Sequence, residues 1–215
     1  QSGSTAVYIR TTQIYKDPTA WMHVAVLIDS TQGTAANRYQ FYVNGSRVTN
    51  LSATTYGDQN LTLKIFTAST VLNLGEDTTG APHYLNGTLC ETLLVDGSTV
   101  AIGDLGEFDE DSPTIWKPKD ISTISVGTNG FRLDYQDSSN LGNDATGGTD
   151  LSESNIVATD QTTDTCTNNF CVLNPLDNST SVAFTLTEGN LVLGDIGSGD
   201  NDHGLRGTFG VNAGK

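Results

Sequence analysis

Short runs that alternate between apolar and polar residues recur along the first half of the chain. In residues 38–43, Tyr39, Phe41 and Val43 fall on one side of an extended segment, because successive side chains of a strand point to opposite faces. Asn44-Gly45 follows and favours a type I′ hairpin turn, since these two residue types accept positive φ. Comparable runs predict strands at residues 7–15, 21–28, 46–49, 61–65, 71–74, 84–89 and 93–95. We therefore expect antiparallel strands in two packed sheets over residues 5–100.

The charge of the chain argues against several classes of partner. Its 215 residues include 25 acidic and 10 basic side chains, for a formal net charge of −15. Such a field repels phosphate backbones and anionic lipid surfaces, so we expect no nucleic-acid partner. The longest apolar run, Val24–Ile28, has five residues, far fewer than the roughly 20 that span a bilayer. Insertion into a membrane is therefore not expected either.

The three cysteines are too few for a disulfide-stapled scaffold. Cys166 and Cys171 enclose four residues, and this loop either closes as a disulfide in an oxidising setting or remains as two thiols. Cys90 lies in a strand-like run, where we interpret it as a small buried hydrophobic residue. The spacing of the cysteines and the three histidines matches no zinc motif.

Four motifs in the first 100 residues occur in an order that resembles a known superfamily. They are Trp21–Val26, Tyr42–Gly45, Leu74-Gly75 and Leu85–Glu91. This series is similar to the laminin-G or concanavalin A-like lectin/glucanase superfamily, which implies an all-β, antiparallel jelly-roll sandwich. The first strands of that family have no counterpart in this sequence.

The second half resembles a different group of proteins. Residues 127–135, 141–148 and 165–176 are similar to passages in structural proteins of marine tailed bacterial viruses that carry lectin-like domains. Residues 189–215 look like the opening strands of a SPRY-type domain. The resemblances imply a partial lectin-like sandwich over residues 1–105 and a connector over 106–127. After the connector they imply an extended, loop-rich β segment over residues 128–176 and the start of a further β domain over 177–215.

Together these resemblances imply a virion structural protein, in a tail, fibre or capsid-surface position. Its partners would be other copies or other virion proteins, and host-surface glycans. The alternatives are a secreted carbohydrate-binding protein or a glycoside hydrolase of the same superfamily, and a purely architectural module. The expected location is the virion surface or the extracellular space.

An enzyme is not expected, because the acidic run 107–111 lacks the required spacing. Retaining glucanases of this superfamily place carboxylates in an E-x-D-x-x-E pattern, with one as nucleophile and another as acid. From Glu107 that pattern needs a glutamate at position 112, which is Ser112. We also expect the run to lie in a loop of the connector, since Pro113 follows it. No nucleophile elbow, zinc-protease pair or phosphate-binding loop is present.

Two groups of residues are candidates for binding. A carbohydrate site combines an aromatic platform with hydrogen-bonding side chains, and its candidates are Asp77, His83, Tyr84 and Trp116. Packing is the alternative interpretation of Trp116, and we favour it. Calcium prefers oxygen ligands, and its candidates are Asp195, Asp200 and Asp202, with Glu76-Asp77 beside His83 as a second set. The alternative interpretation of both acidic sets is that they are solvent-exposed turns without a bound ion.

The missing early strands predict that this chain does not complete its own sandwich. The chain starts at Gln1 within polar sequence, so we expect a processed product or a segment of something longer. Strands 21–28 and 89–95 would then leave an unpaired edge, which invites association. An upstream segment or a second subunit is expected to supply the missing strand.

Overall fold

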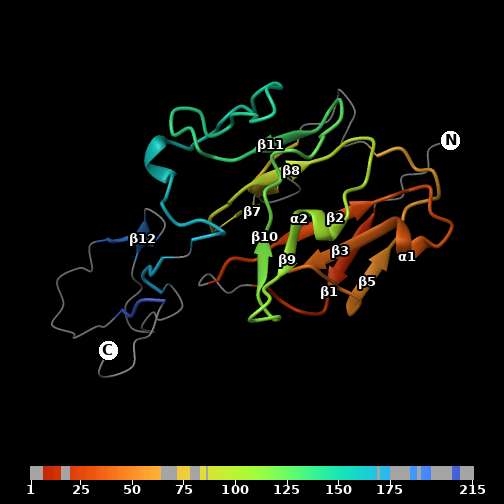
Figure 1. The fold of residues 1–215 in the computed structure, drawn as a ribbon, viewed down its shortest axis with the longest axis horizontal. Helices are drawn as coiled ribbons and strands as arrows, with labels where there is room; N and C mark the ends of the chain where they lie inside the picture. The colour runs from red at the N-terminus through yellow and green to blue at the C-terminus, as the bar shows by residue number, and fades with distance from the viewer. Residues whose placement is uncertain are drawn as a thin grey trace. The chain divides into compact units, whose positions relative to one another are not determined.

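The computed structural model of the chain describes residues 7–15, 20–63, 72–77, 83–85, 87–168, 170–174, 185–187, 190–194 and 205–208. The chain forms two compact units, and Figure 1 traces it through both. Unit 1 comprises Gln1–Tyr15, Met22–Leu85 and Leu93–Phe131, and unit 2 comprises Lys16–Trp21, Asn86–Thr92 and Arg132–Lys215. The division interleaves the chain, whereas the sequence predicted four consecutive segments.

The described residues form small antiparallel sheets with few helical residues, so the predicted all-β class is confirmed. The strands are β1 Tyr8–Thr11, β2 Val24–Ile28, β3 Tyr39–Val43, β4 Ser46–Arg47, β5 Leu51–Thr55, β6 Glu76–Asp77, β7 His83–Tyr84, β8 Thr92–Leu94, β9 Gly106–Phe108, β10 Trp116–Pro118, β11 Phe131–Leu133, β12 Leu186–Thr187 and β13 Val192–Leu193. The helical segments are α1 Ala35–Arg38, α2 Ile102–Leu105 and the 3-10 turn η2 Ala158–Asp160. No described helix has the length and apolar character needed to cross a bilayer.

The three-stranded sheet β2-β3-β4 is the centre of unit 1. Strands β2 and β3 pair along their whole length, from Val24 opposite Val43 to Ile28 opposite Tyr39. Asn44 and Gly45 link β3 to β4 with φ values of 45° and 70°, the left-handed conformation that a type I′ turn needs. The predicted hairpin is therefore confirmed.

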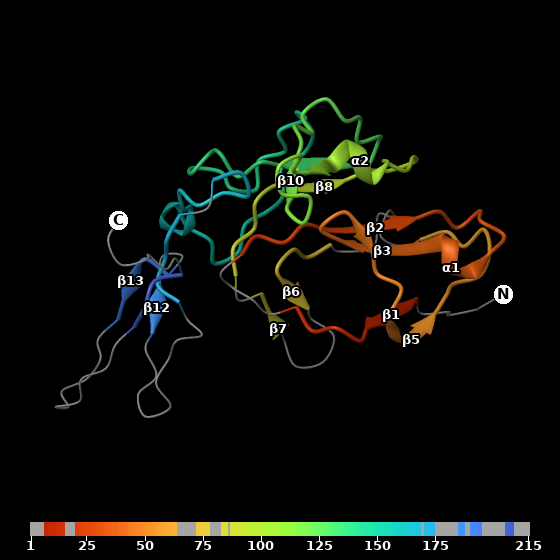
Figure 2. The ribbon, with the colours of Figure 1, turned by 60° about the horizontal axis from the view of Figure 1, so that its bottom comes forward.

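A second layer of unit 1 is the β1–β5 pair, which lies below the β2-β3-β4 sheet in Figure 2. Strand β5 was not predicted, because four of its five residues are exposed and its sequence has no apolar alternation. Its register with β1 shifts between Arg10 and Thr11. Tyr39, at the start of β3, is only 3% exposed, and the absence of a side chain at Gly57 leaves room for its hydroxyl.

The predicted connector contains a hairpin. Strands β9 and β10 pair antiparallel, with Trp116 opposite Phe108 and Pro118 opposite Gly106. Glu107 lies in β9, so part of the acidic run expected in a loop is a strand. Alternation is too short in these three-residue strands for the sequence pattern to mark them.

Some predicted strands are shorter than expected or lie elsewhere. Residues 61–63 and 72–74 are not in strands, and 64–71 lie outside the described residues. The run predicted at 84–89 contributes only Tyr84 to β7, and the run predicted at 93–95 corresponds to β8.

Unit 2 is built around Leu133 and Leu141, which are 2% and 8% exposed. The loop after β11 returns to this strand through the Ala145 N–H, which donates to the Arg132 carbonyl at 2.8 Å. Asp144 is buried beside them and 4% exposed. Strands β12 and β13 form a separate small pair.

Candidate functional site

The β6–β7 hairpin brings together three of the four predicted carbohydrate-binding positions. Its register places Asp77 opposite His83 and Glu76 opposite Tyr84. The Leu85 N–H donates to the Gly75 carbonyl at 2.8 Å and extends the pairing by one position. The sequence alone did not indicate this register, because each strand has only two residues.

The register also selects which residue accompanies Tyr84. Side chains directly opposite each other in an antiparallel pair lie on the same face, and successive side chains lie on opposite faces. Glu76 is therefore the carboxylate on the face of Tyr84, while His83 points to the other face. From the sequence, Glu76 was expected only as a calcium ligand. Only the strand register shows that Glu76 shares a face with Tyr84.

The aromatic ring of this hairpin is open to solvent. Tyr84 is 71% exposed, and Glu76 and His83 are exposed as well. A tyrosine combines a flat apolar face with a polar hydroxyl, so an exposed one can stack on the C–H face of a sugar ring. The neighbouring carboxylate can accept hydrogen bonds from sugar hydroxyls.

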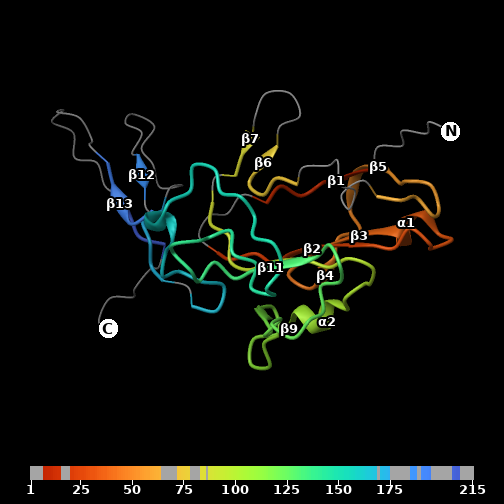
Figure 3. The same cartoon turned by 90° about the horizontal axis from the view of Figure 1, so that it is seen from above.

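The fourth predicted residue, Trp116, lies elsewhere in unit 1. Its ring packs edge-on against Phe108, with centroids 5.1 Å apart and an interplanar angle of 77°, and tilted against His23 at 5.8 Å. A Cβ on Gly45 or on Gly106 would collide with it. Figures 2 and 3 show the β9–β10 and β6–β7 hairpins on opposite sides of the β2-β3-β4 sheet. The tryptophan is thus a packing residue, and it does not join the hairpin.

His23 is part of this packing. Its backbone N–H donates to Asn44 Oδ1 at 2.8 Å and fixes the strand against the Asn44-Gly45 turn. Burial lowers the pKa of the imidazole below 6.5, because the charged form loses hydration. His23 Nδ1 and Trp116 Nε1 are buried, and neither has a hydrogen-bond partner in the part of the chain that the structure describes.

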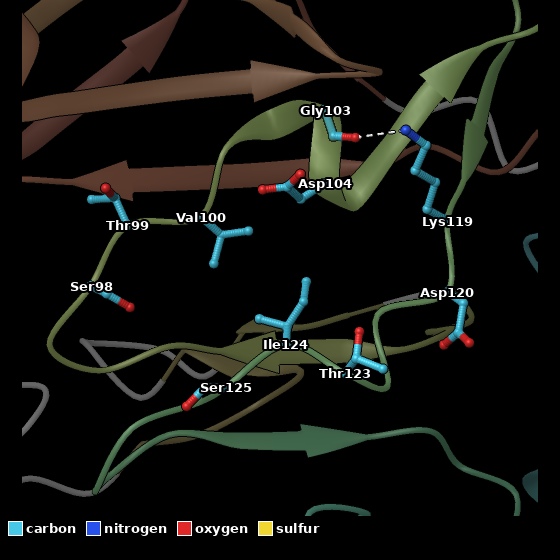
Figure 4. A pocket seen from close by; sticks show the side chains of 10 residues that line it. All are labelled: Ser98, Thr99, Val100, Gly103, Asp104, Lys119, Asp120, Thr123, Ile124 and Ser125. Atoms are coloured by element: carbon cyan, nitrogen blue, oxygen red, sulfur yellow. Dashed lines mark hydrogen bonds between the residues drawn. The ribbon is translucent and has the colours of Figure 1, made fainter.

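A shallow groove of about 440 Å³ lies beside α2, and Figure 4 shows its lining. Lys119 is a cation at its edge, and its Nζ donates to the Gly103 carbonyl at 3.0 Å. The same atom lies 3.2 Å from Glu107 Oε2. Because these two partners already occupy the ammonium group, the groove offers little free positive charge to a ligand. The lining residues are Ser98, Thr99, Val100, Gly103, Asp104, Lys119, Asp120, Thr123, Ile124 and Ser125.

Two carboxylates of the acidic run, Glu107 and Asp109, are paired with lysines. Asp109 lies 2.9 Å from Lys117 Nζ, and its Oδ1 accepts the backbone N–H groups of Asp111 and Ser112. The hydrogen bond from Lys117, followed by that from Ser112, lowers the pKa of Asp109. A general acid in a glycosidase needs a raised pKa, so this arrangement gives no support to hydrolysis.

The calcium candidates Asp195, Asp200 and Asp202 lie outside the described residues. Within the described ranges, no group of three or more His, Cys, Asp and Glu side chains could hold a metal ion.

For Cys166 and Cys171 either a local disulfide or two thiols was expected, and both are free thiols. Cys166 Sγ lies 2.9 Å from Cys90 Sγ, and all three cysteines are free. Cys171 is exposed, and its sulfur contacts only the Val172 carbonyl, at 4.0 Å, among the hydrogen bonds of the described residues. The strand-like run around Cys90 is a strand only from Thr92, where β8 begins, so Cys90 and Glu91 precede the strand.

No protein-family model matches this chain, and no curated protein or solved structure was found to match it.

Proposed function

We propose that this chain is a non-enzymatic virion structural protein whose lectin-like module binds host-surface glycans through the β6–β7 hairpin. The observation that supports binding is the solvent-open ring of Tyr84 beside Glu76 on one face of that hairpin. The virion setting is supported by the resemblance of residues 127–135, 141–148 and 165–176 to phage structural proteins. The position is a tail, fibre or capsid surface.

The chemistry of the hairpin fits a neutral or amine-bearing sugar better than an anionic one. Glu76 carries negative charge next to the tyrosine, and the whole chain has a net charge of −15. Both repel sulfated or sialylated glycans. Stacking on Tyr84 and hydrogen bonds to Glu76 require only an apolar sugar face and hydroxyl or ammonium donors.

The finer fold in this proposal is an antiparallel jelly-roll sandwich. The two layers of unit 1, the β2-β3-β4 sheet and the β1–β5 pair, support a sandwich arrangement. Tyr39, the first residue of β3, is buried. Among the described residues these two layers pair five strands, fewer than the eight of a complete jelly roll.

Assembly with other copies or other virion proteins is the second part of the role. Val24 and Val26 alternate along β2 and are 48% and 56% exposed. Both side chains project from the same face of β2, since they are two residues apart. A neighbouring strand or sheet would bury them.

A glycan array with the purified 215-residue chain tests the binding proposal. We expect retention of neutral or amino sugars, reduced roughly two- to tenfold by Tyr84→Ala, since aromatic stacking contributes about 0.5–1.5 kcal/mol. Tyr8→Ala is the matched control, because Tyr8 is another exposed tyrosine of unit 1. Equal loss in both variants, or no binding to any glycan, would contradict the proposal.

The register gives a second, sharper comparison. Glu76→Gln should weaken glycan binding more than Asp77→Asn, because position 76 and not 77 is opposite Tyr84. Repeating the array with a chelator separates carboxylate hydrogen bonding from calcium-dependent binding. The opposite ranking of the two variants would contradict the assigned face.

Two further measurements test whether the chain is a virion surface protein and whether it is an enzyme. Labelled antibodies to this chain, viewed on intact particles by electron microscopy, should decorate the virion surface. Incubation with β-glucans should release no reducing sugar. Sugar release that Glu107→Gln abolishes would identify the chain as a hydrolase instead.

A further inference from the structure

Cys90 and Cys166 are 76 residues apart in the sequence and adjacent within unit 2. Their Sγ atoms are 2.9 Å apart, and the Cys166 backbone N–H donates to Cys90 Sγ at 3.3 Å. Both side chains are half-buried. Two sulfurs in such close contact need only a small further approach to reach the bond length of a disulfide.

The neighbours of Cys90 hold it in this place. Glu91 Oε1 lies 3.7 Å from Arg132 Nη1, and the Thr92 and Tyr135 hydroxyls are 2.7 Å apart. Glu91 and Thr92 therefore both contact the segment in and directly after β11, while Cys90 contacts the 165–168 turn. Glu91 has a φ of 51°, a conformation that non-glycine residues rarely adopt and that persists only where the surroundings require it.

Cys166 is fixed by a tight turn. The Thr165 and Asn168 backbones exchange two hydrogen bonds, each 3.1 Å long, and the Phe170 N–H donates to Asp164 Oδ1 at 2.8 Å. The turn presents the Cys166 sulfur to Cys90, whereas Cys171 lies beyond it with an exposed side chain.

We propose that Cys90 and Cys166 form a disulfide that staples residues 87–92 to the 165–168 turn of unit 2, and that Cys171 remains an exposed thiol. Because Cys166 can bond to only one sulfur, this bridge excludes the local Cys166–Cys171 pair that the sequence suggested.

The reaction is a thiol–disulfide exchange with a small-molecule disulfide such as oxidised glutathione. One protein thiolate attacks a sulfur of glutathione disulfide, so a mixed disulfide forms and one glutathione thiolate leaves. The second protein thiolate then attacks the mixed disulfide, the Cys90–Cys166 bond forms and the second glutathione leaves. The protein loses two electrons and two protons, and the oxidant gains them as two thiols.

The surroundings of Cys166 make this exchange dependent on pH. Burial, followed by the adjacent Cys90, raises the pKa of the Cys166 thiol to about 12. The thiolate is the attacking form, so closure through Cys166 is slow near neutral pH and accelerates as the pH rises.

Peptide mapping of the whole 215-residue chain tests the bridge directly. The chain is incubated with oxidised glutathione, its free thiols are blocked with iodoacetamide, and it is digested without reductant. Trypsin alone leaves Cys166 and Cys171 in one peptide, since no Lys or Arg separates them. Chymotrypsin cleaves after Phe170 and separates them. We expect a linked pair of peptides containing Cys90 and Cys166, and an alkylated Cys171.

Titration with a thiol reagent gives an independent count. Of the three free thiols, about one should remain after oxidation. Cys171→Ser should still lose both of its thiols, whereas Cys90→Ser should retain its thiols. A Cys166–Cys171 linkage, a linkage only between two chains, or three alkylated cysteines after oxidation would each overturn the proposal. Because the mapping uses the unaltered chain, poor folding of a variant does not affect it.

Discussion

The buried carboxylate of Asp144 is the most consequential single side chain that the structure identifies in unit 2. Its Oδ1 accepts the backbone N–H groups of Arg132 at 3.1 Å and Thr146 at 3.0 Å, and the Thr146 hydroxyl at 2.8 Å. The Gly148 N–H is a further donor. This carboxylate therefore joins strand β11 to the loop that follows it.

Replacing Asp144 by Ala should destabilise unit 2 by about 3 kcal/mol. A hydrogen bond to a charged group contributes about 1.5–3 kcal/mol, and a buried donor left without a partner costs a comparable amount. The Arg132 N–H belongs to a strand and is poorly placed to recover a partner, while Thr146 is exposed and can be rehydrated. For a chain of this size, 3 kcal/mol corresponds to a fall in Tm of roughly 6–12 °C.

Urea denaturation and calorimetry of wild type, Asp144→Ala and Asp137→Ala measure this effect. Asp137 is the matched control, because its Oδ1 also accepts a backbone N–H and a hydroxyl, both from Ser139, but it is exposed. Its loss should cost less than about 1 kcal/mol. If the two substitutions destabilise the protein equally, burial is not the reason for the large contribution of Asp144 to the unfolding free energy.

The dependence on pH provides a second check of the same carboxylate. Burial acts to raise the pKa of Asp144, but hydrogen bonds from Thr146, Arg132 and Gly148 outweigh it, so the pKa lies below 3.8. A lowered folded-state pKa contributes stability that is complete above the unfolded value and is lost as the pH falls through the folded value. The difference between wild type and Asp144→Ala should therefore be constant above pH 3.8 and shrink below it.

Three other predictions concern the hairpin turn and the cysteines. Gly45→Ala should destabilise unit 1 by at least about 2 kcal/mol in a urea titration, because Gly45 has a φ of 70° and a Cβ there would overlap Trp116. The control is Gly33→Ala, which should be nearly neutral because the space around Gly33 is open. Cys90→Ser should lower the unfolding free energy of the oxidised chain by about 4.5 kcal/mol on a loop-entropy estimate for a separation of 76 residues, and a similar loss in reductant would contradict the bridge. The rate of disulfide closure, followed by quenched alkylation, should rise with pH beyond neutrality because the pKa of Cys166 is raised to about 12; a flat profile would contradict this.

Local chemistry in the sequence was enough to predict the all-β class and one hairpin in detail. Asn44 and Gly45 accept positive φ at low cost, and the alternation before them marks β3, so turn and strand follow from neighbouring residues alone. The low charge density and the absence of long apolar runs also required no tertiary information.

Pairing between distant segments was beyond the reach of the sequence pattern. Strand β5 is mostly exposed and polar, so only its partner β1, about 40 residues earlier, identifies it as a strand. The short β9–β10 hairpin is held partly by Trp116, which packs on glycines at 45 and 106. The sequence shows these glycines, but not that one tryptophan covers both.

The candidate binding site and the cysteine pair were likewise predicted in part from single residues and in part only from the tertiary structure. Sequence chemistry identified an aromatic residue, carboxylates and thiols that can bind or react, since those properties belong to single side chains. Register decided that Glu76, and not its neighbour, is opposite Tyr84, and the fold of unit 2 brought Cys90 to Cys166. A pattern of hydrophobic and polar positions marks which face of a strand is buried, but it holds no information about which distant segment becomes its neighbour.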